Sequence, residues 1–194
     1  QVGFQETDII SIAKPITKFS YQLKKETEIK YILEKAFYIS HEGRKGPVLI
    51  DIPMDLQRKT IDPNKLKSFI PPKQKNKKNN KLISQIKTVI RKMEIAKRPV
   101  ILIGGGIRLS KTTKELKNFL KKIKVPLLTT WSGVDAIDHF DNNYIGNIGV
   151  YGSRSANFVI QNSDFVLSLG SRLDTRVTGG APQNFAREAT IASV

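Results

Sequence analysis

The sequence is 194 residues long, carries a formal net charge of +16 and contains no cysteine. This length suits one large domain, or one complete domain and part of another, and the 39% of hydrophobic residues is ordinary for a soluble globular protein. The lack of cysteine excludes disulfides, thiolate metal sites and a cysteine nucleophile, and it favours a cytoplasmic location. Neither a membrane-spanning apolar run nor a signal peptide is visible, and the start at Gln1 leads us to expect that the natural N-terminus is missing.

The excess of positive charge raises the question of a nucleic-acid or membrane partner. The lysines are scattered along expected helix faces and linkers, and they are not interleaved with aromatic residues that could stack on bases. We therefore expect neither nucleic acid nor a membrane as a partner, and a basic nucleic-acid binder is kept only as a minor alternative.

Residues 1–60 have the pattern of the end of a parallel α/β domain. Pro15 interrupts an early apolar segment, and a helix is expected from Thr27, as its N-cap, to Gly43, where it stops. The following "GPVLIDIP" is a short apolar run rich in β-branched residues, which predicts a strand covered on both faces and ended by Pro53. The helix carries an apolar stripe at helical spacing, made of Ile29, Ile32, Leu33, Ala36 and Phe37.

Residues 61–80 are predicted to form a linker. They contain the pair Pro71-Pro72 and the Lys/Asn-rich run "KQKNKKNN", a composition typical of extended, solvated chain. The basic run could bind phosphate groups, but a solvated tether between two domains is favoured.

Residues 81–194 alternate helical stripes with apolar runs, which predicts a parallel, Rossmann-like sheet with right-handed crossovers. Strands are expected at "RPVILI", "VPLLTT", "DFVLSL" and "ATIASV", and a helix at residues 153–162. The fold class is therefore α/β, a parallel Rossmann-like domain preceded by the C-terminal half of a second parallel α/β domain. Two further helices are expected from the stripes Leu82, Ile83, Ile86, Val89, Ile90 and Met93, and Leu116, Phe119, Leu120 and Ile123.

Glycines, hydroxyls and arginines follow the expected strands, at the sheet edge where open parallel sheets bind ligands. Glycine lets a backbone approach a ligand and leaves its amide free for phosphate, and arginine offers a planar donor fork. The edge therefore suits a nucleotide with a diphosphate. For Gly104–Gly106 a purely structural turn is an equal alternative, and Arg172 and Arg176 could instead form a surface ion pair with Asp174, although ligand binding is favoured for the arginines.

Several other kinds of site are not indicated. His41 and His139 both lie in polar, turn-like contexts and are interpreted as surface residues. No catalytic triad, phosphate-binding loop or set of metal ligands with familiar spacing is visible, so no metal site is predicted within the chain.

Five segments occur in the order and at the distances found in thiamine-diphosphate enzymes, and together they resemble acetolactate synthase over nearly the whole chain. Several motifs in the correct order are more specific than any single one. The segments are "GFQETDIISIAKPITKFSYQL", "GRKGPVLIDIPMDLQ", "RPVILIGGG", "TTWSGVDAI" and "LGSRLDTRVTGG".

The resemblance implies that residues 1–60 are the C-terminal part of the pyrimidine-binding domain. Residues 81–194 would be the central domain, truncated at its C-terminus, which holds FAD in a structural role. Gln5 would be a catalytic residue bordering the thiamine diphosphate, with Phe4 and Met54 in the substrate pocket. The implied flavin contacts are Gly104, Gly105, Gly106, Thr130, Trp131, Gly149, Tyr151, Gly170, Arg172, Asp174, Arg176 and Val177.

Four residues depart from the family pattern. Met54 stands where the family usually has lysine, Trp131 replaces a leucine, Tyr151 a histidine and Thr175 an aspartate. These departures leave open which 2-keto acid is used, and whether FAD, ADP or nothing binds the central domain. A flavin-free 2-keto acid decarboxylase or carboligase is one alternative, and a non-catalytic nucleotide-binding module is another.

The resemblance implies a lyase or transferase that decarboxylates pyruvate or another 2-keto acid and then joins carbon units, as in branched-chain amino acid biosynthesis. Thiamine diphosphate, held through Mg²⁺, would carry the reaction in a homodimer or homotetramer, with a regulatory subunit left open. The activating glutamate is expected before Gln1 and the Mg²⁺-binding motif after Val194. We therefore expect the isolated chain to be inactive.

Overall fold

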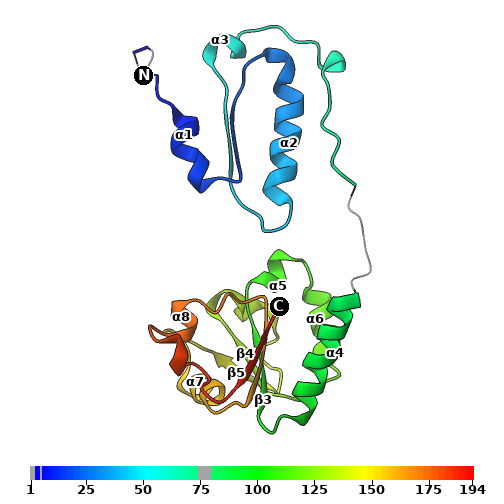
Figure 1. Cartoon of the computed structure of the whole chain (residues 1–194), viewed down its shortest axis with the longest axis vertical. Coiled ribbons are helices and arrows are strands. Elements are labelled where there is room, and N and C mark those ends of the chain that lie inside the picture. The colour runs from blue at the N-terminus through cyan, green and yellow to red at the C-terminus, as the bar shows by residue number, and fades with distance from the viewer. Residues whose placement is uncertain (1–2, 5, 74–79) are drawn as a thin grey trace. The chain divides into compact units, whose positions relative to one another are not determined.

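The computed structural model describes residues 3–4, 6–73 and 80–194, and the chain divides into two compact units, Gln1–Lys77 and Lys78–Val194 (Figure 1). In the described parts of both units every strand pair is parallel, with helices between the strands, which confirms the predicted α/β class. Within the described ranges, no helix has the length and apolar character needed to cross a membrane.

The first unit is built on two parallel strands, β1 (Phe19–Gln22) and β2 (Val48–Asp51), which pair from Phe19 opposite Val48. Helix α2 (Ile29–His41) connects them and buries Ile32 and Ala36. The shorter elements are α1 (Ile9–Ala13), η1 (Lys14–Ile16), η2 (Glu26–Glu28), α3 (Met54–Gln57) and η3 (Pro63–Lys65).

The boundaries of α2 were predicted in part. A 3₁₀ turn precedes the helix, so Glu28 and not Thr27 is the N-cap, and the predicted cap is wrong. The predicted stop is confirmed, because the helix ends at His41 and Gly43 takes a φ of +55°, which favours glycine. Strand β2 is only half-buried along its length, so the expected cover on both faces is wrong for this unit.

Part of the predicted linker packs against α2. The ring of Phe69 lies edge-on to Tyr31, with centroids 5.6 Å apart, and also contacts Tyr38. Its backbone N–H donates to Glu34 Oε2 at 2.7 Å. Phe69 is therefore anchored on α2, whereas most of the Lys/Asn-rich run falls in 74–79, outside the described residues.

The second unit contains a five-stranded parallel sheet in the order β5-β4-β3-β6-β7. The four predicted strands are confirmed, but β5 was missed, because its sequence "YIGN" lacks an apolar run and includes Gly146 at a φ of +139°. The strands are β3 (Pro99–Ile103), β4 (Leu127–Thr129), β5 (Tyr144–Asn147), β6 (Phe165–Leu169) and β7 (Thr190–Ser193). The helical elements are α4 (Asn80–Ile95), α5 (Gly106–Leu109), α6 (Thr113–Leu120), η4 (Trp131–Ala136), α7 (Arg154–Gln161), α8 (Thr175–Thr178) and η5 (Pro182–Asn184).

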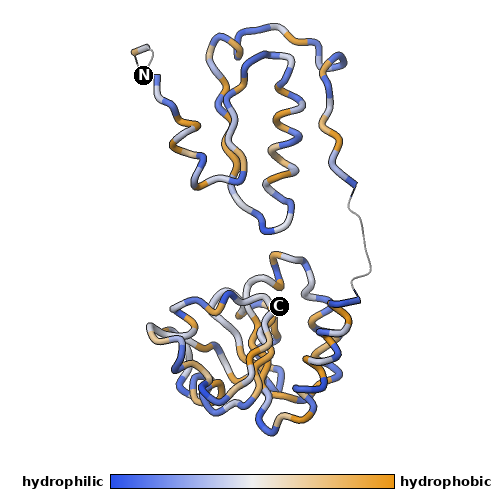
Figure 2. Tube along the Cα trace, in the orientation of Figure 1, coloured by the Kyte–Doolittle hydropathy of each residue, from blue (hydrophilic) through white to orange (hydrophobic). Residues whose placement is uncertain are grey.

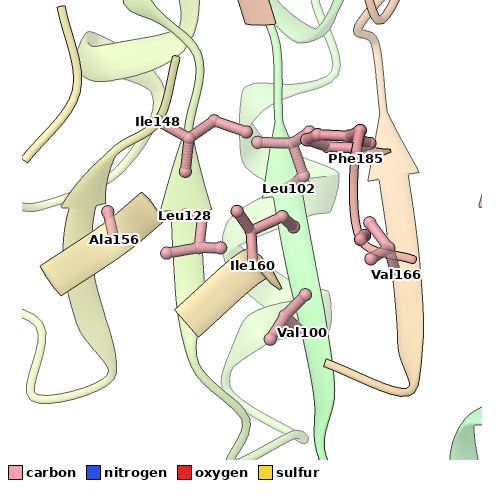
Figure 3. Close-up of a cluster of buried hydrophobic side chains, with 9 residues drawn as sticks. Val100, Leu102, Leu128, Ile148, Ala156, Ile160, Val166 and Phe185 are labelled. Atoms are coloured by element: carbon pink, nitrogen blue, oxygen red, sulfur yellow. The ribbon is translucent and has the colours of Figure 1, made fainter. Parts of the chain in front are cut away.

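Two hydrophobic clusters cover the two faces of this sheet. On one face, Ala156 and Ile160 of α7 pack over Leu102 of β3 and Leu128 of β4 (Figure 3). On the other face, α4 and α6 contribute Met93 and Leu116 among others. Figure 2 accordingly shows hydrophobic residues along the central strands. This core holds in place the sheet whose edge carries the candidate site.

The predicted apolar stripe of α4 is only partly buried. Val89 and Met93 pack against the core, but Leu82, Ile83, Ile86 and Ile90 stay 47–51% exposed. The helix predicted from this stripe is confirmed, and the core cluster reaches only its C-terminal half.

Candidate functional site

The carboxyl ends of β3, β4 and β6 bring the predicted ligand residues of the second unit to one edge of its sheet. β4 lies on one side of β3 and β6 on the other, so the strand order reverses between β3 and β6. Such a reversal is where open α/β sheets leave a crevice for ligands. The turns after β3 and β6 meet at this point.

The three-glycine turn after β3 packs against the turn after β6. A Cβ on Gly104 would lie 2.4 Å from the carbonyl oxygen of Gly170, and one on Gly106 would lie 2.7 Å from the Gly170 Cα. The N–H groups of Gly104 and Gly106 donate to the carbonyls of Leu169 and Gly170, at 2.8 and 2.9 Å. Close packing therefore accounts for both glycines, and neither amide is free for a phosphate.

Gly105 differs from its two neighbours. Its amide donates no hydrogen bond to any residue that the structure describes, so it is the one amide of this turn still available to a ligand. An ion pair between Arg108 of α5 and Asp135 of η4 links the turn after β3 to the turn after β4. Neither residue was singled out from the sequence, because only the fold brings the two turns together.

After β4, a buried threonine precedes an exposed tryptophan. Thr130 is buried and its amide donates to the Ile103 carbonyl at 2.9 Å, which holds the turn against β3. Trp131 is 63% exposed and meets Tyr151 edge to face, with ring centroids 4.6 Å apart. Two predicted site residues from different turns are thus in direct contact.

The turn after β5 is held by a residue that the sequence analysis missed. The side-chain amide of Asn157 in α7 accepts from the Gly149 N–H at 2.9 Å and donates to the Gly149 carbonyl at 3.1 Å. Gly149 has a φ of +96°, and a Cβ there would lie 2.3 Å from the Arg176 carbonyl. A lone asparagine on an amphipathic helix gives no signal in sequence that it holds a distant turn.

After β6, Asp174 has two local roles. It caps α8 by accepting from the Arg176 N–H at 3.1 Å, and it forms an ion pair with Arg172 at 3.5 Å. The surface ion pair considered from the sequence is therefore present for Arg172. Val177 is half-buried and packs against the core.

The Arg176 guanidinium has no hydrogen-bond or ion-pair partner among the residues that the structure describes. Its backbone carbonyl accepts from the Val150 N–H at 3.0 Å, which places α8 beside the turn after β5. The edge thus combines one unpaired cation with exposed aromatic rings, a set of groups that fits a nucleotide.

The site residues predicted for the first unit are not brought into one described site. Phe4 is 93% exposed, and Met54 is 67% exposed at the start of α3, directly after β2. Gln5 lies outside the described residues. His41 and His139 are exposed, as predicted, and no cluster of three or more potential metal ligands occurs within the described ranges.

Comparison with known proteins adds two findings. Residues 86–194 match the thiamine pyrophosphate enzyme central domain. Over 99% of its length the chain is 38% identical to the acetolactate synthase large subunit of Buchnera aphidicola (subsp. Schizaphis graminum) and 36% identical to a probable one of Methanococcus aeolicus. It is 33% identical, over 91% of its length, to the acetolactate synthase large subunit of Haemophilus influenzae. The chain spans about a third of these relatives, covering 34%, 32% and 31% of them.

Proposed function

The chain belongs to the thiamine pyrophosphate enzyme family, whose central domain it contains, and on that premise we propose that it acts within an acetolactate synthase-like enzyme. Such an enzyme decarboxylates pyruvate or another 2-keto acid and joins the remaining carbon unit to an acceptor. The similarity to acetolactate synthase large subunits at 33–38% identity supports this reaction class.

Within that enzyme, residues 81–194 bind a nucleotide, of which FAD in a structural role is the first candidate. The observation that carries this proposal is the sheet edge at which the strand order reverses. Among the described residues, neither the Arg176 guanidinium nor the Gly105 amide there has a partner, and the rings of Trp131 and Tyr151 are exposed. Thr130 and Gly149 shape the turns on either side. Gly104, Gly106 and Gly170 serve by close packing, and Asp174 by holding α8 and pairing with Arg172.

Residues 1–60 act as the C-terminal part of the pyrimidine-binding domain, joined to the central domain through residues 61–80. Gln5 borders the thiamine diphosphate, with Phe4 and Met54 in the substrate pocket. Thiamine diphosphate and Mg²⁺, when bound, would supply the nucleophilic chemistry that acts on the 2-keto acid. The contribution of this chain is to position cofactors and substrate. The enzyme works in the cytoplasm as a homodimer or homotetramer, with a regulatory subunit as a further partner.

The enzyme containing these residues is tested by supplying pyruvate, thiamine diphosphate and Mg²⁺ and measuring acetolactate. Its absorbance spectrum is recorded after purification, because bound FAD colours the protein yellow. Acetolactate together with a flavin spectrum supports the proposal. Carbon dioxide release without a flavin would favour the decarboxylase or carboligase alternative, and nucleotide binding without any reaction would favour a non-catalytic module.

A second test addresses the nucleotide alone. FAD and ADP are titrated against the chain, and Arg176→Ala is compared with Arg172→Ala. Arg172 already pairs with Asp174, whereas Arg176 is unpaired within the described residues, so Arg176→Ala should weaken binding by about tenfold and Arg172→Ala by less. Equal effects of the two variants would contradict the role given to Arg176.

A further inference from the structure

Helix α4 carries a row of isoleucines that its own unit leaves half-exposed. Ile83, Ile86 and Ile90 are 47%, 48% and 49% exposed, and their spacing of three and four positions puts them on one face of the helix. The core cluster instead takes up Val89 and Met93 of the same helix. The 16 residues of α4 span about 24 Å, whereas the five residues of β3 or of β6 span about 17 Å, so the helix is longer than the strands against which it packs.

Positive charge borders this isoleucine row. Lys87 and Arg91 follow Ile83 by four and eight positions, so they lie along the same side of the helix. Both are exposed, and neither has an ion-pair partner in the ranges that the structure describes. Glu94 is the only acidic residue of α4, against four basic ones. Helix α6, which packs in the same core cluster, adds two lysines and one glutamate, so this side of the unit is basic.

The spacing and the charge together indicate what kind of partner fits. An apolar row at helical spacing is a surface on which an amphipathic helix can pack. The basic border selects the charge of that helix, because opposite charges across an interface favour the right partner and like charges oppose the wrong one. A second copy of this chain is disfavoured for the same reason, since pairing α4 with α4 would bring two basic borders together, and each copy carries a net charge of +16.

An anionic membrane also attracts basic, apolar helices, but α4 is poorly suited to one. Helices that lie in a membrane interface present a large apolar face with Trp, Phe or Leu. α4 contains no aromatic residue, and Val89 and Met93 already hold part of its apolar side against the core. The helix therefore offers lipid only a narrow row, which suits a partner helix better.

We propose that the isoleucine row of α4 is a docking surface for an acidic amphipathic helix of another protein. Apolar side chains of the partner pack on Ile83, Ile86 and Ile90, and its carboxylates pair with Lys87 and Arg91. This docking does not depend on nucleotide binding by the same unit.

The test uses a fluorescently labelled synthetic peptide with leucine at its a and d positions and glutamate at e and g, and a second peptide with lysine in place of each glutamate. Fluorescence anisotropy measures the binding of each peptide to the full chain. The acidic peptide should bind at least about tenfold more tightly than the basic one, and added salt should weaken it. Ile86→Ala and Arg91→Glu should each weaken binding of the acidic peptide by about tenfold.

Ile95→Ala and Lys24→Glu are the matched controls, and both should bind the acidic peptide normally. Ile95 is 75% exposed but lies nine positions after Ile86, two and a half helical turns away and so on the opposite side of α4. Lys24 is exposed in the first unit, and Lys24→Glu changes the net charge by as much as Arg91→Glu does. Far-ultraviolet circular dichroism checks that each variant keeps its helix content.

A chain that binds neither peptide, or that binds both equally, would overturn this docking surface, and so would binding unaltered by Ile86→Ala. Self-association of the chain in sedimentation, abolished by Ile86→Ala, would assign the row to a second copy instead. Binding to vesicles of anionic phospholipid, lost in Ile86→Ala and without binding of the acidic peptide, would assign it to a membrane.

Discussion

The two compact units differ in how completely they bury their strands. In the second unit, Ile101, Leu102 and Ile103 of β3 are fully buried, and β4 and β6 are enclosed by helices on both faces. In the first unit, no residue of β1 or β2 is buried. Parallel sheets are usually found with helices covering both of their faces. A sheet of only two strands is marginally stable in water by itself. We expect the second unit to be the more stable of the two.

The largest effect is expected from Phe165→Ala. Phe165 in β6 is 2% exposed, and its removal leaves a cavity in the core, so the free energy of unfolding of the second unit should fall by about 3–5 kcal/mol. Urea denaturation followed by Trp131 fluorescence measures this unit, since the only tryptophan lies in it. Ile32→Ala in the first unit is the control. An equal shift of the Trp131 transition by Ile32→Ala would show that the two units unfold as one.

A smaller loss is expected from Gly104→Ala, because the added methyl would lie 2.4 Å from the Gly170 carbonyl oxygen and the backbone must move. The free energy of unfolding should fall by about 1–3 kcal/mol. Gly180→Ala is the matched control, with no atom within 4 Å of the new methyl. A stable Gly104→Ala protein that had lost only nucleotide binding would instead favour the ligand role for this glycine.

Asp164→Asn is expected to lower the stability of the protein by an amount that depends on pH. Burial alone would raise the pKa of Asp164, but the N–H groups of Arg98 and Lys97, each donating at 2.8 Å, hold it below its ordinary value of 3.8. A lowered pKa in the folded state stabilises the protein above pH 3.8, and this stabilisation is lost as the pH falls through the folded-state pKa. Wild type should therefore exceed Asp164→Asn in melting temperature at neutral pH, and the two should converge below pH 3.8.

Glu94→Gln serves as the control for this comparison, because its side chain has no hydrogen-bond or ion-pair partner among the described residues. The difference in melting temperature between wild type and Glu94→Gln should not depend on pH in the way expected for Asp164→Asn. A difference between wild type and Asp164→Asn that stayed constant with pH would show that the carboxylate charge is not what joins the turn before β3 to the start of β6.

The smallest effect is expected from Phe37→Ala in the first unit. Phe37 is 69% exposed on α2, so its removal should change the free energy of unfolding by less than about 0.5 kcal/mol. Far-ultraviolet circular dichroism during urea denaturation measures it, with Ile32→Ala, 5% exposed on the same helix, as the larger reference. A large loss for Phe37→Ala would show that another surface covers this face of α2.

Local patterns in the sequence predicted most of the elements. The apolar runs before Gly104 and Gly170 became β3 and β6, and helical spacing located α2, α4, α6 and α7. Burial requires such patterns wherever a strand or a helix face lies in a core, so they can be read without knowing the fold. The family resemblance then pointed to the thiamine pyrophosphate enzymes, and the match of residues 86–194 confirms it.

Features that depend on distant parts of the chain could not be predicted in the same way. Strand β5 has no apolar run, because it is an edge strand that contributes little to the core. Asn157 hydrogen-bonds to Gly149, and the ring of Phe69 packs against Tyr31. Each contact joins segments that become neighbours only in the folded chain. A sequence pattern shows how apolar residues are spaced within one segment, but it does not show which other segment will pack against it.

The sequence by itself determined that the second unit is a parallel α/β domain with glycines and arginines beyond its strands. Only the tertiary structure decided how those residues are used. Backbone packing between two turns occupies the amides of Gly104 and Gly106, while Arg176 remains unpaired among the described residues. The same packing brings Trp131 against Tyr151, since the order of the strands sets which turns become neighbours at the edge.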